Sequence, residues 1–177
     1  MADTGRRIVR SSITEEKLEA KVENKKSFKH IKGLCFIDER CQIIKTAARK
    51  PIKDLNKLPF PAYHLLDLKN YIPLPHQYKI LPAINVVTSR GCPWGKCTFC
   101  FESIRPGSFR RMSPNRVVSL IKILTITYGI KEIMFWDDLF TLPQNWVYEF
   151  CSLIKKENIN IIWSCYAKVD SVNPSLL

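Results

Sequence analysis

The sequence has few acidic residues, few histidines and no long apolar run. Sixteen Asp and Glu stand against 28 Lys and Arg, so the formal net charge is +12 over 177 residues. No apolar signal segment follows Met1, and no run approaches the length of a membrane-spanning helix. These absences argue against a secreted, disulfide-stabilised protein and against membrane insertion. We therefore expect a cytoplasmic protein with reduced thiols.

The excess of basic residues could attract nucleic acid. Lys and Arg are spread along the chain, however, and no recognition helix or patch with interleaved aromatic residues concentrates them. A solvated basic surface is therefore the simpler interpretation. A non-catalytic, metal-stabilised, basic RNA-binding module is kept as the alternative function.

Three of the seven cysteines are concentrated in one short segment. Cys92, Cys97 and Cys100 have four and then two residues between them, and Gly and Pro residues in the same segment favour turns. The three sulfurs can therefore point toward a common centre. A structural zinc site would need a fourth Cys or His at finger-like spacing, and all three histidines are upstream and isolated. Three thiolates suit a 4Fe-4S cluster with one open iron, although a zinc-binding knuckle remains the simple alternative.

The other four cysteines are spread over two regions. Cys35 and Cys41 flank an expected turn, whereas Cys151 and Cys165 lie within apolar helix and strand patterns. We interpret all four as core or incidental thiols.

The chain divides into three regions by composition. Residues 1–28 mix charges of both signs with few apolar anchors, which is typical of a mobile leader. Residues 29–82 read as a linker region, with a hairpin of strands at 34–37 and 42–45 and one short helix near 62–68 among many prolines. Residues 83–177 alternate between strand and helix patterns. This alternation predicts an α/β fold. A complete eight-unit barrel would need about 250 residues, so the chain can hold only part of one.

The alternating region contains three expected strands and two expected helices. The strands are expected at 84–88, 132–136 and 160–166, and the helices at 114–128 and 144–158. Right-handed crossovers would make the sheet parallel, and the carboxyl end of each strand would carry polar groups. The final residues, 173–177, look like the start of another helix, so we expect a truncated piece of a larger protein.

The cysteine segment and its surroundings resemble the radical S-adenosylmethionine (SAM) superfamily, in particular its cobalamin-associated branch. That branch often carries a Ser-Arg-Gly-Cys-Pro lead, which is present here at 89–93. Segments 110–114, 132–141 and 162–170 also follow the order of elements in the branch. Region 29–82 resembles the end of a cobalamin-binding domain, and within it residues 53–63 look like the segment that joins such a domain to the radical core. The resemblance therefore covers roughly residues 30–177. One departure is that the superfamily usually has three residues between the first two cysteines. An extra Gly in a loop is easily absorbed.

The resemblance implies a partial (β/α) barrel of the radical SAM type over 83–177, truncated and preceded by the hairpin and linker. It implies that Cys92, Cys97 and Cys100 ligate a 4Fe-4S cluster, which binds S-adenosylmethionine and cleaves it reductively to a 5′-deoxyadenosyl radical. The chain would then be an enzyme fragment with an unknown substrate. Its electron donor would be a protein such as flavodoxin or ferredoxin.

The resemblance also implies roles for residues outside the cysteines. Phe99 occupies the aromatic position that borders the adenine, and Asp137 and Asp138 stand where relatives receive the methionine amino group. Alternatively, Phe99 packs the loop, and the two carboxylates organise the start of the following helix. Ser164, Tyr166 and Lys168 alternate along the third strand and would share a face.

Two further features concern charge and cobalamin. Arg90 and Lys96 would add positive charge near the cluster and favour its reduced form. Cobalamin domains that use a histidine ligand resemble one another in an Asp-x-His-x-x-Gly signature, and here Phe28 stands in the Asp position before His30 and Gly33. We therefore reject His30 as a cobalt ligand and expect cobalamin only in a full-length protein.

Overall fold

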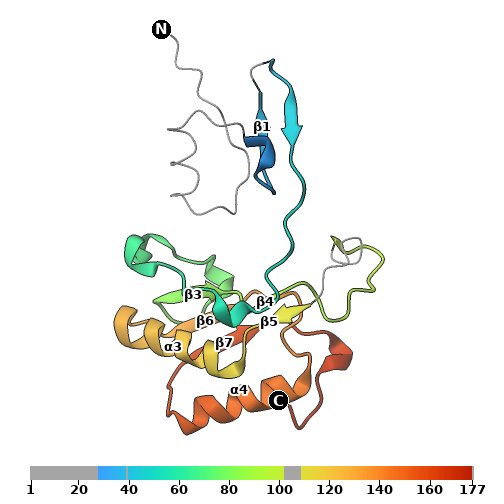
Figure 1. The fold of residues 1–177 in the computed structure, drawn as a ribbon. Helices are drawn as coiled ribbons and strands as arrows, with labels where there is room; N and C mark the ends of the chain where they lie inside the picture. The colour runs from blue at the N-terminus through green and yellow to red at the C-terminus, as the bar shows by residue number, and fades with distance from the viewer. Residues whose placement is uncertain (1–27, 39, 102–108, 177) are drawn as a thin grey trace. The chain divides into compact units, whose positions relative to one another are not determined.

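The computed structural model describes residues 28–38, 40–101 and 109–176, and these fall into two units (Figure 1). One unit ends at Ile52 and the other begins at Lys53. The expected leader, apart from Phe28, lies outside the described residues. Among the described residues, none of the helices has the length and apolar character needed to cross a membrane.

The first unit is a small hairpin. A 3-10 turn, η1 (Phe28–His30), precedes β1 (Cys35–Ile37), which pairs antiparallel with β2 (Ile43–Lys45). Phe28, Leu34 and Phe36 form its buried core. The expected hairpin is confirmed, and each strand begins one residue later than predicted.

The second unit is built on a three-stranded parallel sheet. β3 (Ala83–Val86), β6 (Glu132–Phe135) and β7 (Ile162–Cys165) lie in the order β3-β6-β7. The crossovers are α3 (Pro114–Tyr128) and α4 (Gln144–Lys156), which contact each other (Figure 1). The α/β class and the parallel sheet are therefore confirmed, while closure into a barrel stays a prediction.

The core lies between the helices and one face of the sheet. The ends of α3 follow from its sequence, because the Ser113 side chain accepts the N–H of Arg116, Pro114 opens the helix, and Gly129 ends it at φ +64°. Apolar residues of both helices pack on the strand residues of that face. The members of this core include Val86, Val117, Ile121, Leu124, Ile133, Phe135, Val147 and Phe150.

The strands end earlier at their carboxyl ends than the sequence predicts. β3 stops at Val86, and the next residues turn their backbone N–H groups toward a side chain of the neighbouring loop. β7 stops at Cys165, so Lys168 does not continue a strand face shared with Ser164. Instead, Lys168 precedes the 3-10 turn η6 (Val169–Ser171). That part of the sequence prediction was wrong.

The segment before the sheet, residues 53–82, lies in the second unit. It contains the 3-10 turns η2 (Leu55–Lys57), η3 (Tyr63–Leu65), η4 (Leu68–Asn70) and η5 (Pro75–Gln77) where one short helix was predicted. The Arg116 guanidinium on α3 stacks 3.6 Å from the ring centroid of Phe60. This contact joins the segment to α3 within one unit, and the predicted division at residue 82 stays a prediction.

Candidate functional site

The carboxyl ends of β3 and β6 are joined through the buried side chain of Asp137. Its Oδ1 accepts the backbone N–H groups of Thr88 at 2.9 Å and Ser89 at 2.5 Å, and its Oδ2 accepts the Thr88 hydroxyl at 2.7 Å. The Ser89 hydroxyl is also 2.5 Å from Oδ1. Because all three residues are buried, these bonds replace water that the groups have lost. The loop that carries the cysteines therefore starts from a fixed point.

The two neighbouring carboxylates differ in their surroundings. Asp137 is 1% exposed and bonded as described, whereas Asp138 is exposed. Neither caps the next helix, because α4 begins after Pro143 without a side-chain cap. The alternative that these carboxylates organise the helix start therefore gains no support from capping and stays a prediction. Their predicted contact with a cofactor stays a prediction, and Asp138 is the carboxylate that solvent reaches.

Arg111 packs beside the same network. Its guanidinium lies 3.7 Å from the ring centroid of Trp146 and 4.6 Å from that of Phe140, and its Nη1 donates to the Leu142 carbonyl at 2.9 Å. Its Nε and Nη2 are buried and have no hydrogen-bond partner among the described residues. Burial lowers the pKa of Arg111 to about 10, although the Asp137 carboxylate acts in the opposite direction.

The cysteine loop leaves from one strand of a small antiparallel pair and returns to the other. β4 (Ser89–Arg90) pairs with β5 (Arg110–Arg111), which closes the base of the loop. Gly91 and Gly95 both have positive φ, +79° and +56°, which Gly adopts without steric cost. This matches their predicted role as turn residues.

Cys92, Cys97 and Cys100 are all partly buried in this loop. The N–H of Cys100 donates to the Cys97 carbonyl at 3.1 Å, so the chain reverses between these two residues. Three thiols in one loop are the donor set that an iron–sulfur cluster uses, so the residues fit that group chemically. Over the part of the chain that the structure describes, no three His, Cys, Asp or Glu side chains are placed together as a metal site. The ligand assignment therefore stays a prediction.

The aromatic residues of the loop face different surroundings. The Phe99 side chain is 91% exposed, so it does not pack the loop. The Lys168 ammonium lies 4.1 Å from the Trp94 ring centroid, and the Lys96 ammonium lies 5.3 Å from the same centroid. The loop thus contacts the segment that follows β7.

Sequence reasoning missed the roles of Thr88, Ser89 and Arg111. Ser89 belongs to the Ser-Arg-Gly-Cys-Pro lead, but its residue type alone does not indicate a bond to Asp137. A polar pair directly after an apolar strand was the available signal, since buried polar groups at such a position need partners. Arg111 gave no such signal, because arginine is usually exposed.

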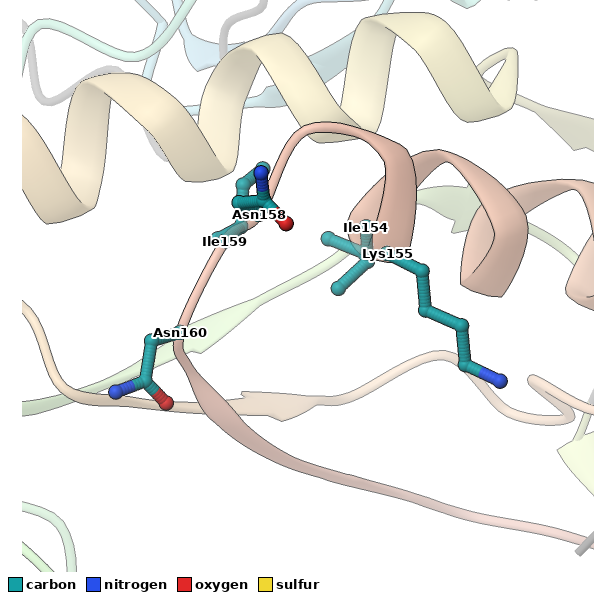
Figure 2. A pocket seen from close by; sticks show the side chains of 5 residues that line it. All are labelled: Ile154, Lys155, Asn158, Ile159 and Asn160. Atoms are coloured by element: carbon teal, nitrogen blue, oxygen red, sulfur yellow. The ribbon is translucent and has the colours of Figure 1, made fainter.

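A surface hollow lies away from this loop. Figure 2 shows it at the turn between α4 and β7, lined by Ile154, Lys155, Asn158, Ile159 and Asn160. This turn precedes β7, whereas the cysteine loop follows β3, so the two lie at opposite ends of a parallel sheet. The hollow is therefore not the cysteine site.

Two curated proteins resemble the chain in sequence. A protein named as an uncharacterized methyltransferase of Pyrococcus horikoshii is 33% identical over 162 residues, which are 91% of this chain and 34% of that protein. An anaerobic magnesium-protoporphyrin IX monomethyl ester cyclase of Synechocystis is 30% identical over 148 residues, which are 84% of this chain and 28% of the cyclase. No family model matches the chain.

Solved structures of OxsB, described as a cobalamin-dependent S-adenosylmethionine radical enzyme, share the fold. The apo form superposes with a TM-score of 0.64 at 24% identity, over 90% of this chain and 22% of OxsB. The form with aqua-cobalamin and S-adenosylmethionine bound gives a TM-score of 0.62 at 21% identity, over the same shares. The chain therefore shares its fold with part of a cobalamin-dependent radical SAM enzyme.

The chain spans about a third of the length of the curated relatives that it matches. The relatives are enzymes by name, and their names describe two different reactions, methyl transfer and ring closure. None of these relatives or structures is named for nucleic-acid binding. The resemblance seen in the residues is therefore confirmed at the level of the fold, and the reaction belongs to the proposal that follows.

Proposed function

We propose that the chain contributes the cluster-binding part of a radical SAM enzyme, in which Cys92, Cys97 and Cys100 hold a 4Fe-4S cluster. The observation that carries the proposal is the position of these thiols, in a loop that leaves the carboxyl end of a parallel strand at a fixed, buried residue pair. The bound cluster would supply the electron that cleaves S-adenosylmethionine to a 5′-deoxyadenosyl radical. A protein such as flavodoxin or ferredoxin would deliver that electron.

The described residues suggest how this chain would orient the cofactor. The exposed ring of Phe99 lies between two of the thiols in sequence and offers an apolar face to the adenine. The exposed carboxylate of Asp138 follows β6, on the same edge of the sheet as the loop, and can accept hydrogen bonds from an ammonium group. Asp137 is already occupied by Thr88 and Ser89, so its role is to hold the start of the loop.

The larger protein would complete the barrel and the substrate pocket, and cobalamin would bind there outside this chain. The likeness to OxsB supports this part, because one of its solved forms holds both aqua-cobalamin and S-adenosylmethionine. Methyl transfer and ring closure are both compatible with the two curated relatives.

Iron content after anaerobic reconstitution tests the cluster. We expect about four irons per chain, brown absorbance and slow release of 5′-deoxyadenosine when reductant and cofactor are supplied. Cys97→Ala should lose most of the iron. The matched control, Cys41→Ala, removes an exposed thiol of the other unit and should bind as much iron as the wild type. A colourless protein that holds zinc, or iron retained by Cys97→Ala, would refute the proposal, and zinc together with salt-sensitive RNA binding would favour the RNA-binding module.

Binding of S-adenosylmethionine tests the cofactor residues separately. In reconstituted protein, Asp138→Asn should weaken binding about tenfold in equilibrium dialysis, because a charge-assisted hydrogen bond is lost. Phe99→Ala should weaken it by a similar factor through lost ring contact. Unchanged binding in either variant would remove that residue from the cofactor site while leaving the cluster assignment intact.

A further inference from the structure

Trp94 connects the cysteine loop to the segment that follows β7, the edge strand opposite β3. Its ring lies within the four-residue interval between Cys92 and Cys97, and the Lys168 ammonium sits 4.1 Å from the ring centroid. Lys96, in the same interval, is 5.3 Å from that centroid. Because Lys168 comes after β7 and Trp94 after β3, the contact spans the three strands of the sheet. No other described cation contacts this ring.

The backbone of Lys168 is held in place by the turn that follows it. Its N–H donates to the Ser171 hydroxyl at 3.1 Å, and that hydroxyl is 2.6 Å from the Lys168 carbonyl. Ser171 is 2% exposed, and its oxygen lies 2.5 Å from the Thr141 hydroxyl in the loop after β6. Lys168 therefore projects from a point that is fixed to the sheet, and its side chain also pairs with the exposed Asp170 carboxylate.

The free energy of such a contact is small but sufficient to bias a loop. A cation over a tryptophan face shifts an equilibrium by a factor of about two to five at an exposed site and about thirty when desolvated. Trp94 is 39% exposed, which places it between these cases. Loss of the contact would leave the sheet folded, because no core residue depends on it, but it would enlarge the range of positions that the loop samples.

We propose that Lys168 is a positioning residue of the cysteine loop, acting through Trp94 to hold the interval between Cys92 and Cys97. The proposal rests on the proposed function for the cluster-binding role of the loop, whereas the contact between Lys168 and Trp94 does not depend on it. In a loop with one residue more than the usual spacing of this superfamily, the contact gives the longer interval an external anchor. The three thiols are thereby held closer to one arrangement before any metal binds.

The metal-free protein provides the first test. We expect Lys168→Gln to raise the rate at which iodoacetamide alkylates Cys92 and Cys97 by about threefold, measured by peptide mass spectrometry, in proportion to the lost contact. The increase is expected because a loop without this anchor would sample more positions in which its thiols meet the reagent. Lys168→Arg should retain the wild-type rate, since a guanidinium also stacks on tryptophan.

Two controls separate the contact from general effects of charge. Lys156→Gln removes an exposed lysine of α4 with the same change in net charge and should leave the alkylation rates unchanged. In a Trp94→Ala background, Lys168→Gln should add nothing, which is the signature of a pairwise interaction. Equal or slower alkylation in Lys168→Gln, or an undiminished effect without Trp94, would overturn the proposal.

Reconstituted protein provides the second test. Loss of iron to a chelator should be about threefold faster in Lys168→Gln than in wild type or Lys168→Arg. If the wild type takes up no iron, the proposed function fails, and the alkylation rates still decide the positioning role. If the wild type binds iron and Lys168→Gln keeps it equally well, the positioning role fails while the cluster assignment stands.

Discussion

The Asp137 carboxylate accepts two hydrogen bonds from Thr88, one from the Thr88 backbone N–H at 2.9 Å and one from the Thr88 hydroxyl at 2.7 Å. Both residues are at most 1% exposed. The Asp137 side chain, in the loop after β6, thus accepts backbone N–H groups beyond the end of β3. The cysteine loop follows directly in sequence, so its first residues are held in place by these bonds.

Removal of this carboxylate should destabilise the fold. Asp137→Ala would leave the buried N–H groups and hydroxyls of Thr88 and Ser89 without an acceptor, which should cost about 3 kcal/mol of unfolding free energy. Asp137→Asn should cost about 2 kcal/mol, because the charge is lost while the oxygen remains. Urea denaturation followed by tryptophan fluorescence measures both. Asp138→Asn is the matched control and should change stability by less than about 0.5 kcal/mol; similar losses for both aspartates would contradict the structural difference between them.

How far the sequence could predict this site depends on which contacts are local. Helix α3 was predictable, because Ser113, Pro114 and Gly129 each act on neighbouring backbone. The parallel direction of the strands followed from the alternation of strands and helices. The bond between Ser89 and Asp137 joins residues 48 positions apart, so no local pattern contained it. The same holds for Lys168, whose partner on the cysteine loop is brought near only by the sheet.

A second buried acid attaches the segment before the sheet. Glu132 is 3% exposed, and its Oε2 accepts the N–H groups of Lys79 at 2.6 Å and Ile80 at 2.8 Å. Glu132→Ala should cost about 2 kcal/mol, because two donors lose their acceptor. Glu132→Gln should recover part of this, since its amide oxygen can still accept.

Urea denaturation and limited proteolysis within residues 53–82 check this prediction. Faster cleavage is expected in Glu132→Ala, because the segment is released from the sheet. Glu149→Ala, which removes an exposed acid from α4, should match the wild type in both measurements. Equal cleavage rates in the wild type and Glu132→Ala would show that the segment is held by its apolar contacts alone.

Arg111 should not be replaceable by lysine. Its guanidinium stacks on Trp146 at 3.7 Å and bonds the Leu142 carbonyl, and an ammonium cannot reproduce the planar stack. Arg111→Lys should therefore cost about 1–2 kcal/mol in urea denaturation and change the emission of Trp146. Arg90→Lys, at an exposed position on the adjacent strand, should leave stability within about 0.5 kcal/mol. A neutral Arg111→Lys would mean that the stack contributes nothing beyond its charge.

The Cys165 thiol should make stability depend on alkaline pH. Burial raises its pKa from 9.0 to about 11, with the nearby Arg111 acting against the shift. In the unfolded chain the thiol ionises near its ordinary pKa, so the stabilisation is fully present below pH 9 and is lost as pH rises through about 11.

Arg111, whose pKa is lowered to about 10, contributes in the opposite direction, with stability that rises above pH 10. Because Arg111 is present in both proteins, the difference in unfolding free energy between wild type and Cys165→Val reports the thiol together with its electrostatic coupling to Arg111. That difference should shift in favour of Cys165→Val between pH 9 and pH 11, as measured by urea denaturation at each pH. Cys41→Ala, which removes an exposed thiol, should track the wild type throughout. A constant difference between Cys165→Val and wild type across this window would show that the thiol ionises as readily in the folded chain as in the unfolded one.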